Sequence, residues 1–207
     1  MDSVKKAETE GLQWLGVAIS IAALFGKRVT EILSLSRNQF IVKDGFLFIR
    51  FRVGKKRDKN EPIPHFYLKR KTLKHPLTKY IIDFISPIKE GYIFPSSRHE
   101  QAIKQKVMVK RKDGSLKQCE YSYTVPGGFI SRQLALYYLK KISPTSWFHL
   151  FRESLATSMA EEGASEEELM HWFDWDTPAS AHKYVKRGTK LTEKWSSDVP
   201  RDYVGMV

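Results

Sequence analysis

His149, Arg152 and Tyr184 have the types and the spacing that chemistry on a phosphodiester needs. His149 and Arg152 are three residues apart at the start of a helical pattern, which puts both on one helix face. Tyr184 follows after a second helical segment. An Arg guanidinium binds two oxygens and stays ionised, His can move a proton, and a Tyr phenol can act as a covalent nucleophile. These residues therefore predict a site that holds a phosphodiester between cations and attacks it with a phenol.

The charge balance of the chain favours a polyanionic partner. The 207 residues, enough for one domain with one core, carry 35 Lys and Arg against 23 Asp and Glu, a formal net charge of +12. The plainer interpretation is a basic protein whose charge serves only its solubility. The single cysteine, Cys119, rules out a disulfide within the chain and fits a reducing, intracellular setting.

Membrane proteins and metalloenzymes are not indicated by the sequence. The most apolar run, Leu12–Phe25, is shorter than the roughly 20 residues of a membrane span, so we expect a buried helix and no membrane partner. The sequence has no HExxH, no carboxylate cluster and no Cys/His pairs at zinc spacing. We therefore expect no metal and no cofactor, and the cations of the site must be side chains.

The pattern of apolar residues predicts an α+β fold that is mainly α-helical. Helical periodicity alternates with two stretches of strand periodicity, and Asp44-Gly45 is a strong hairpin signal. Ser165 and Glu168 form a capping box. The predicted elements are, in order, a helix over 3–25 ended by Gly26, a helical segment from Val29, a small antiparallel sheet over about 40–68 with a lysine-rich turn at 54–60, a helix over 78–85, an extra hairpin inserted at 104–125, a helix over 128–141, a helix carrying His149 that Thr145 or Ser146 caps and Gly163 ends, a helix after Ser165, a helix from Pro178 carrying Tyr184, and an extended or weakly helical tail.

Three boxes of the sequence together resemble the catalytic domain of the tyrosine recombinases, the site-specific integrases. Residues 26–35, GKRVTEILSL, are similar to the first arginine box of that family, G-x-R-x-[ST]-E-x-x-x-L. Residues 149–152, HLFR, are similar to the second box, H-x-x-R, and are followed by the expected Ala-Thr and Gly. Trp175 stands nine residues before Tyr184, where the family has His or Trp. The resemblance covers essentially the whole chain.

The resemblance implies a role for each residue of the first two boxes. Arg28 and Arg152 would bind the phosphate, and Glu31 would support the site. His149 would shuttle a proton or donate a hydrogen bond to the phosphate. Taken alone, Arg28 is more simply a surface cation at a helix start and His149 a structural or exposed histidine. The agreement of all three boxes favours the functional roles.

The resemblance also implies a general acid and a nucleophile. The family places a lysine on the hairpin after the first box, often as G-K-x-x-K, and Lys55 matches by position as the acid for the leaving 5′ oxygen. Lys56 and Lys59 are the alternatives. Tyr184 would be the nucleophile, and Trp175 would offer its indole N–H and pack against the phosphate. The third box departs from the usual L-G-H and reads Phe-Asp-Trp at 173–175.

Plainer interpretations remain for the residues around the third box. Tyr184 could be a core residue, and Tyr203 could be the nucleophile, although it lies in a tail without helical context. His171 is the rival of Trp175, but it precedes Tyr184 by 13 residues, four too many. Trp172 is more simply explained by packing.

Basic residues on the two predicted turns are candidates for contact with the DNA backbone. Such contacts add affinity and salt dependence without sequence choice. A solvated hairpin tip is an equally good interpretation of the second cluster. The candidates are Lys56, Lys59, Lys110, Arg111 and Lys112.

The resemblance also predicts how the chain is organised. We expect a catalytic domain over 1–187 and a tail over 188–207 that contacts a neighbouring protomer. Only 27 residues precede Arg28, so we expect this chain to lack the helical core-binding domain that usually comes first in the family. The lysine-rich composition suggests an integrase of an archaeal virus or plasmid.

The implied function is site-specific DNA recombination. Strands of double-stranded DNA would be cleaved and rejoined through a 3′-phosphotyrosyl link without metal or ATP, by a dimer or tetramer on DNA inside the cell, at the nucleoid. The closest alternative is a type IB topoisomerase-like enzyme, which would relax DNA without exchanging partners. The alternative from another class is a non-catalytic DNA-binding module.

Overall fold

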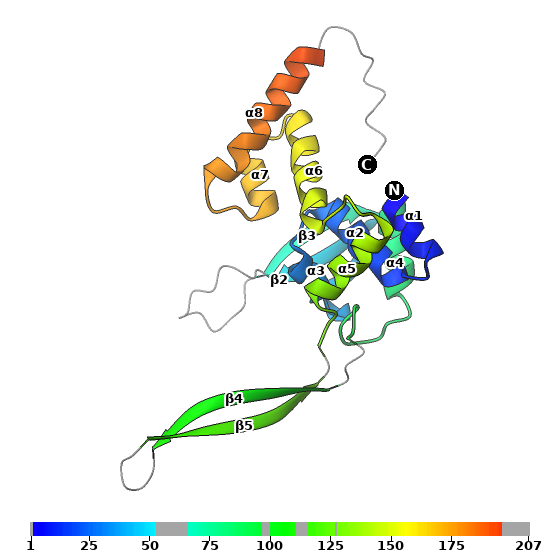
Figure 1. The fold of residues 1–207 in the computed structure, drawn as a ribbon. Coiled ribbons are helices and arrows are strands. Elements are labelled where there is room, and N and C mark those ends of the chain that lie inside the picture. The colour runs from blue at the N-terminus through cyan, green and yellow to red at the C-terminus, as the bar shows by residue number, and fades with distance from the viewer. Residues whose placement is uncertain (1, 53–65, 97–99, 111–115, 127, 196–207) are drawn as a thin grey trace.

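The chain folds into a mainly helical α+β structure, as predicted, with one small antiparallel sheet and a separate hairpin (Figure 1). The computed structural model describes residues 2–52, 66–96, 100–110, 116–126 and 128–195. Its elements are α1 (Asp2–Thr9), α2 (Gln13–Phe25), α3 (Val29–Leu33), η1 (Arg37–Gln39), β1 (Phe40–Lys43), β2 (Phe46–Arg52), β3 (Phe66–Thr72), α4 (Pro76–Ile85), β4 (Glu100–Lys110), β5 (Leu116–Pro126), α5 (Arg132–Ile142), α6 (Phe148–Glu161), α7 (Glu166–Phe173) and α8 (Pro178–Trp195).

Helix α2 lies at the centre of the larger core. It is apolar nearly all round, as a helix covered on every side must be, and Leu15, Ile19 and Phe25 are fully buried. The helix ends at Gly26 as predicted. Gly26 has a left-handed φ of 61°, and its N–H donates to Ala22 O at 2.8 Å. The sharp exit at Gly26 turns the chain directly into the first box.

The single helix predicted over 3–25 is wrong. Helix α1 ends at Thr9, and Gly11, with a φ of 70°, reverses the chain before α2 begins at Gln13. The Leu12 N–H donates to Ala7 O at 2.8 Å and closes the turn. Both helices direct apolar side chains at the same core, so their helical periodicity runs on across the break and hides it.

The sheet covers one side of this core. Its order is β1-β2-β3, antiparallel throughout, and it extends to Thr72, beyond the predicted 68. Leu47, Ile49 and Phe51 alternate along β2 and are buried, as the two-residue period of a strand requires. The predicted Asp44-Gly45 turn is confirmed, and both of its residues have positive φ.

Strands β4 and β5 form the predicted extra hairpin, but it is longer than the sequence indicated. The pairing runs from Glu100 with Pro126 to Lys110 with Leu116. Figure 1 shows the hairpin projecting from the end of the molecule opposite to α8.

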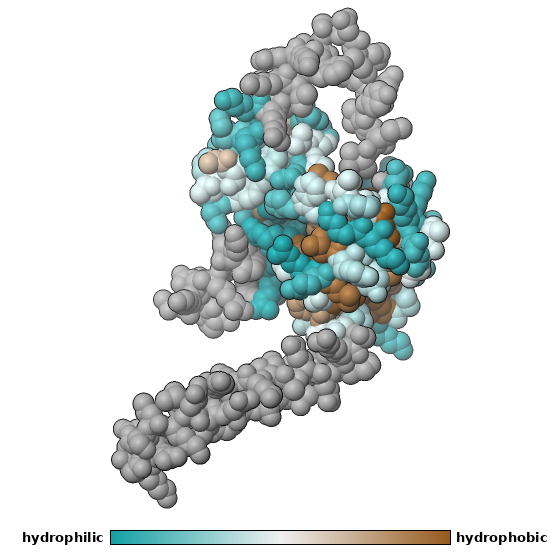
Figure 2. All heavy atoms as spheres, viewed as in Figure 1, coloured by the Kyte–Doolittle hydropathy of each residue, from teal (hydrophilic) through white to brown (hydrophobic). Residues whose placement is uncertain are grey.

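Helices α6, α7 and α8 enclose a second, smaller core. Its buried members are Leu155, Ala156, Ala160, Leu169, Phe173, Ala181 and Tyr184. The predicted capping box of α7 is confirmed, since Ser165 and Glu168 bond to each other's backbone N–H groups. Figure 2 shows hydrophilic side chains over these helices and apolar ones gathered on the neighbouring body.

Three helix boundaries differ from the prediction. The N-cap of α6 is Trp147, without a side-chain bond, and not Thr145 or Ser146. Helix α5 starts at Arg132 after a Ser131 cap, and not at 128. Helix α8 continues to Trp195, so the first residues of the predicted tail are helical. None of the described helices has the length and apolar character that crossing a membrane requires.

Replacement of Gly26 by Ala should destabilise the fold by backbone strain and by a steric clash together. A Cβ at Gly26 would clash with the Phe173 ring and lie 3.2 Å from Leu155, in addition to the left-handed φ. We expect Gly26→Ala to lower the free energy of unfolding by about 2–4 kcal/mol, measured by urea denaturation.

Gly163→Ala is the matched control. Gly163 follows α6 with a φ of 93°, and a Cβ there has no neighbour within 4 Å. We expect a loss of about 1 kcal/mol from the backbone alone. Equal losses for the two variants would show that the contact between Gly26 and Phe173 does not matter.

Candidate active site

Arg152 joins the two cores at the point where the first and third boxes meet. From α6, its Nη1 donates to Gly26 O at 2.6 Å and its Nη2 donates to Phe173 O. The side chain is 2% exposed. Burial, and next the positive charge of Arg28, lower the pKa of Arg152 to about 10. A guanidinium has five N–H donors, so three remain for another acceptor.

Arg28 is held in place by Glu31. Arg28 is the N-cap of α3, and its backbone N–H donates to Glu31 Oε2 at 3.0 Å. Its Nη1 lies 2.8 Å from Glu31 Oε1. The Glu31 side chain is 7% exposed, whereas that of Arg28 is 30% exposed. Glu31 thus fixes a guanidinium that still reaches solvent, which is the geometry that a supporting role requires.

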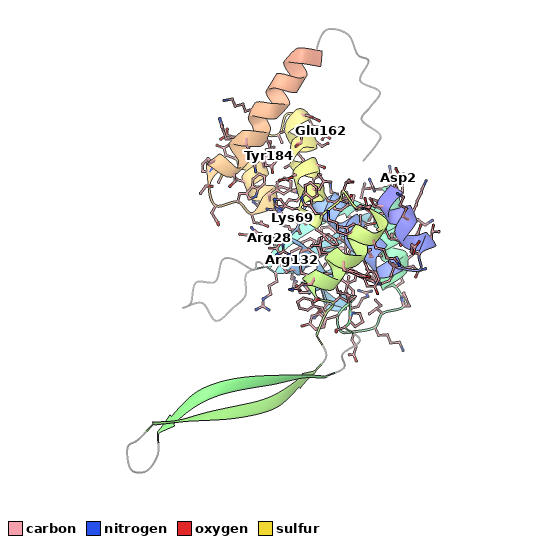
Figure 3. All side chains as sticks on the ribbon, in the orientation of Figure 1. Asp2, Arg28, Lys69, Arg132, Glu162 and Tyr184 are labelled. Carbon is pink, nitrogen blue, oxygen red and sulfur yellow. The ribbon has the colours of Figure 1, made fainter. Side chains whose placement is uncertain are left out.

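A cavity of about 280 Å³ brings Arg28 and His149 together. His149 is 61% exposed, and its Nε2 lies 3.6 Å from Glu153 Oε1. The remaining lining combines cationic and apolar residues: Lys27, Val29, Thr30, Arg132, Leu136, Trp147 and Phe148. Figure 3 shows Arg28 and Arg132 close together beside the body of the molecule. The cavity has the composition of a site for an anion attached to an apolar group.

His149 and Arg152 differ in exposure, although both come from one turn of α6. His149 is exposed in the cavity, while Arg152 is buried among backbone carbonyls. Their sequence spacing predicted a shared ligand. In the structure Arg152 bonds to Gly26 O after α2 and to Phe173 O at the end of α7, and Arg28 is close enough to lower its pKa.

Tyr184 belongs to a stack of three aromatic rings, and Arg152 contacts the other two rings. Its ring stacks on Trp175 at 5.3 Å between centroids with an angle of 5° between planes. Trp175 stacks in turn on Phe173 at 4.8 Å. The Arg152 Cζ is 5.0 Å from the Phe173 ring and 5.5 Å from the Trp175 ring. Tyr184 is 3% exposed, so it is packed in the smaller core as well as placed beside a cation.

Three charged residues that the sequence analysis did not select also belong to this region. Lys27 is 2% exposed and forms an ion pair with Asp174. Lys69, on β3, is 6% exposed and donates to His171 O at 3.0 Å. Figure 3 places Lys69 between Arg28 and Tyr184. Two sequence features could have indicated Lys27 and Asp174. Both residues lie within the boxes, and Asp174 stands at a helix end, where Gly is the usual residue.

The histidines and tryptophan near the third box have the plainer roles. His171 and His182 are exposed, and His182 Nδ1 lies 2.5 Å from Glu166 Oε1. Trp172 is a packing residue, with Lys69 Nζ at 5.0 Å and Lys71 Nζ at 5.1 Å from its ring centroid.

Several predicted site residues lie outside the described residues: Lys55, Lys56, Lys59, Arg111, Lys112 and Tyr203. Lys110 is the last residue of β4. Within the described part of the chain, no three His, Cys, Asp or Glu residues are grouped so that they could hold a metal ion.

Comparison with known proteins finds a family, and solved structures, that this chain is similar to. The model of the phage integrase family matches residues 4–190. The XerH site-specific recombinase bound to palindromic difH substrate, in a post-cleavage complex, has a TM-score of 0.63 at 12% identity, covering 95% of this chain and 50% of that one. XerH bound to difH substrate in a pre-cleavage complex has a TM-score of 0.57 at 12% identity, covering 95% and 51%. This chain thus spans about half the length of the XerH chains. A search of curated protein sequences gave no match.

Arg152→Ala should destabilise the protein strongly, because it leaves the buried carbonyls of Gly26 and Phe173 without their donor. We expect a loss of about 2–4 kcal/mol in the free energy of unfolding. His149→Ala, three residues away and exposed, is the control and should cost less than about 0.5 kcal/mol. Equal unfolding midpoints for Arg152→Ala and the parent would contradict the bridging role.

Proposed function

Since the chain belongs to the phage integrase family, whose model covers residues 4–190, we propose that it cleaves and rejoins DNA strands through a covalent 3′-phosphotyrosyl intermediate. The family and fold predicted from the three boxes are confirmed. The activity and the role of each residue are our proposal, and this chain spans only about half of the XerH chains.

The observation that supports this proposal best is the meeting of the three boxes at Arg152. Arg152 bonds the first box through Gly26 O and the third through Phe173 O, and lies one indole away from Tyr184. A phosphate on Arg28 and His149 would occupy the adjoining cavity.

The proposed reaction is a transesterification at phosphorus. The Tyr184 Oη gives up its proton, with His149 as the proposed proton shuttle, and attacks the phosphorus; a 3′-phosphotyrosyl bond forms, and the bond to the 5′ oxygen breaks. Lys55 gives a proton to the departing 5′ oxygen. Arg28, Arg152 and His149 stabilise the charge on the non-bridging oxygens. Rejoining reverses these steps with a 5′ hydroxyl of another strand, so the bond energy is kept and no ATP or cofactor enters.

The proposed partner is double-stranded DNA, bound by the two predicted basic turns. Lys56, Lys59, Lys110, Arg111 and Lys112 are proposed contacts to the phosphate backbone. We further propose that two or four copies assemble on paired sites, with residues 188–207 contacting a neighbour, at the nucleoid inside the cell. Origin in an archaeal virus or plasmid stays a prediction.

A suicide DNA substrate tests the nucleophile. Its nick lets a short 5′-hydroxyl fragment diffuse away after cleavage, so the protein stays attached to the DNA. We expect a covalent adduct with the parent chain and none with Tyr184→Phe, which keeps the ring on Trp175 but has no hydroxyl. Adducts are counted on a denaturing gel.

Tyr203→Phe is the matched control and should form the adduct at the parent rate. An adduct that persists in Tyr184→Phe and disappears in Tyr203→Phe would assign the nucleophile to the other tyrosine. Paired sites and a supercoiled plasmid without sites then separate recombination from relaxation by a topoisomerase-like enzyme.

A sulfur leaving group tests Lys55 as general acid. A thiol has a pKa of about 8.5 and leaves as a thiolate, so a substrate with sulfur at the 5′ bridging position needs no proton. We expect Lys55→Ala to cut oxygen substrate about 10²–10⁴ times more slowly than the parent and to cut the sulfur substrate at nearly the parent rate. If Lys56→Ala or Lys59→Ala shows this rescue instead, the acid is that lysine.

A further inference from the structure

The end of α7 is held by three cations from three separate parts of the chain. The last carbonyls of a helix have no partner within it and carry the negative end of the helix dipole. Here Met170 O accepts from the backbone N–H of Trp175 at 3.1 Å. The next three carbonyls each accept from a different side chain: His171 O from Lys69 at 3.0 Å, Trp172 O from Lys27 at 3.4 Å, and Phe173 O from Arg152.

Lys27 also pairs with the residue that follows the helix. Asp174 is the C-cap of α7, with a left-handed φ of 53° that a non-glycine residue rarely adopts. The Lys27 and Asp174 side chains are 1% and 6% exposed, so the ion pair is buried. In the pattern that the third box resembles, glycine stands at this place. In this chain an Asp stands there, and its carboxylate meets a lysine from the first box.

Burying these cations costs free energy, because each one loses its hydration. The lowered pKa values of Lys27 and Lys69 reflect this loss. Burial lowers the pKa of Lys27, and Asp174 partly restores it; burial and then the charge of Lys27 lower the pKa of Lys69. A buried ion pair often adds little net stability compared with apolar residues of similar size, whereas it fixes geometry closely. We therefore expect the Lys27–Asp174 pair to affect the position of the turn at 171–174 more than the free energy of unfolding.

The residue held in position is Trp175, the next one along the chain. Its ring lies between Phe173 and Tyr184, nearly parallel to the tyrosine. A shift of the turn at 171–174 therefore moves the surface on which the Tyr184 ring rests. We propose that the Lys27–Asp174 pair and Lys69 are positioning residues that set Tyr184 for attack through Trp175; this inference rests on the proposed function.

The double variant Lys27→Met/Asp174→Gly tests the proposal. It removes both charges together and gives the left-handed position a glycine, so neither a lone buried charge nor a strained backbone remains. We expect its melting temperature to stay within about 4 °C of the parent. Its single-turnover rate of adduct formation on the suicide substrate should fall about 10–100-fold, because a misplaced nucleophile reacts slowly.

Two further variants separate position from charge. Lys71 lies on the same face of β3 as Lys69, and both contact the Trp172 ring. Lys71 is not one of the three cations that bond the end of α7, so Lys71→Met should keep the parent rate. Lys27→Arg keeps a cation opposite Asp174 and should keep most of the parent rate of adduct formation. The DNA dissociation constant of the double variant should match that of Lys71→Met, which places the loss in the chemical step.

Hydrogen exchange gives a readout that does not depend on activity. The Trp175 N–H is bonded to Met170 O, so a peptide covering 171–176 should exchange faster in the double variant and at the parent rate in Lys71→Met. Parent-like rates of cleavage and exchange in the double variant would overturn the proposal. If the parent forms no adduct, the proposed function fails, and the exchange experiment alone decides whether the cations hold the turn.

Discussion

The site depends on one guanidinium placed between two backbone carbonyls. Arg152 reaches Gly26, 126 residues away in the sequence, and Phe173, 21 residues away, with two nitrogens of one rigid plane. A buried cation is costly unless its hydrogen bonds are made, so both backbone carbonyls must lie beside it in the folded chain. Arg152 therefore connects the first box to the third, and α6, which carries it, has buried residues in both cores.

Among the described residues around Arg152, the cations outnumber the carboxylates that they contact. Lys27, Arg28, Lys69 and Arg152 face two carboxylates, Glu31 and Asp174, each already bonded to one of these cations. Backbone carbonyls supply the remaining negative partial charges. Such an arrangement keeps cations close together without a counter-ion for each. It leaves an excess of positive charge beside the cavity where a phosphodiester would bring a negative one.

The parts of the structure that local chemistry determines could be predicted from the sequence. The hairpin at Asp44-Gly45, the end of α2 at Gly26 and the capping box at Ser165 each depend on residues within a few positions. The break at Gly11 was missed because apolar residues face the same core on both sides of it. The start of α6 was misplaced because Trp147 precedes it without a capping bond.

Longer-range pairing was beyond the reach of sequence patterns. The three boxes gave the identities of the residues around Arg152, but not that Arg152 is buried or that Tyr184 is packed on Trp175. Lys27 and Lys69 bond to groups 145 and 102 residues away, and lysine is so rarely buried that its ordinary interpretation is a solvated cation. Only the folded chain shows which lysines have exchanged water for carbonyl oxygens.

The projecting hairpin extends away from the helices that carry the candidate site. The ten steps of extended strand from Glu100 to Lys110, at about 3.4 Å each, give β4 a length of about 34 Å. One turn of duplex DNA is about 34–36 Å long, so the two ends of the hairpin are about a helical turn apart. If Lys110 contacts the DNA backbone as proposed above, a substitution there would change how the chain is anchored and leave the atoms around Arg152 in place.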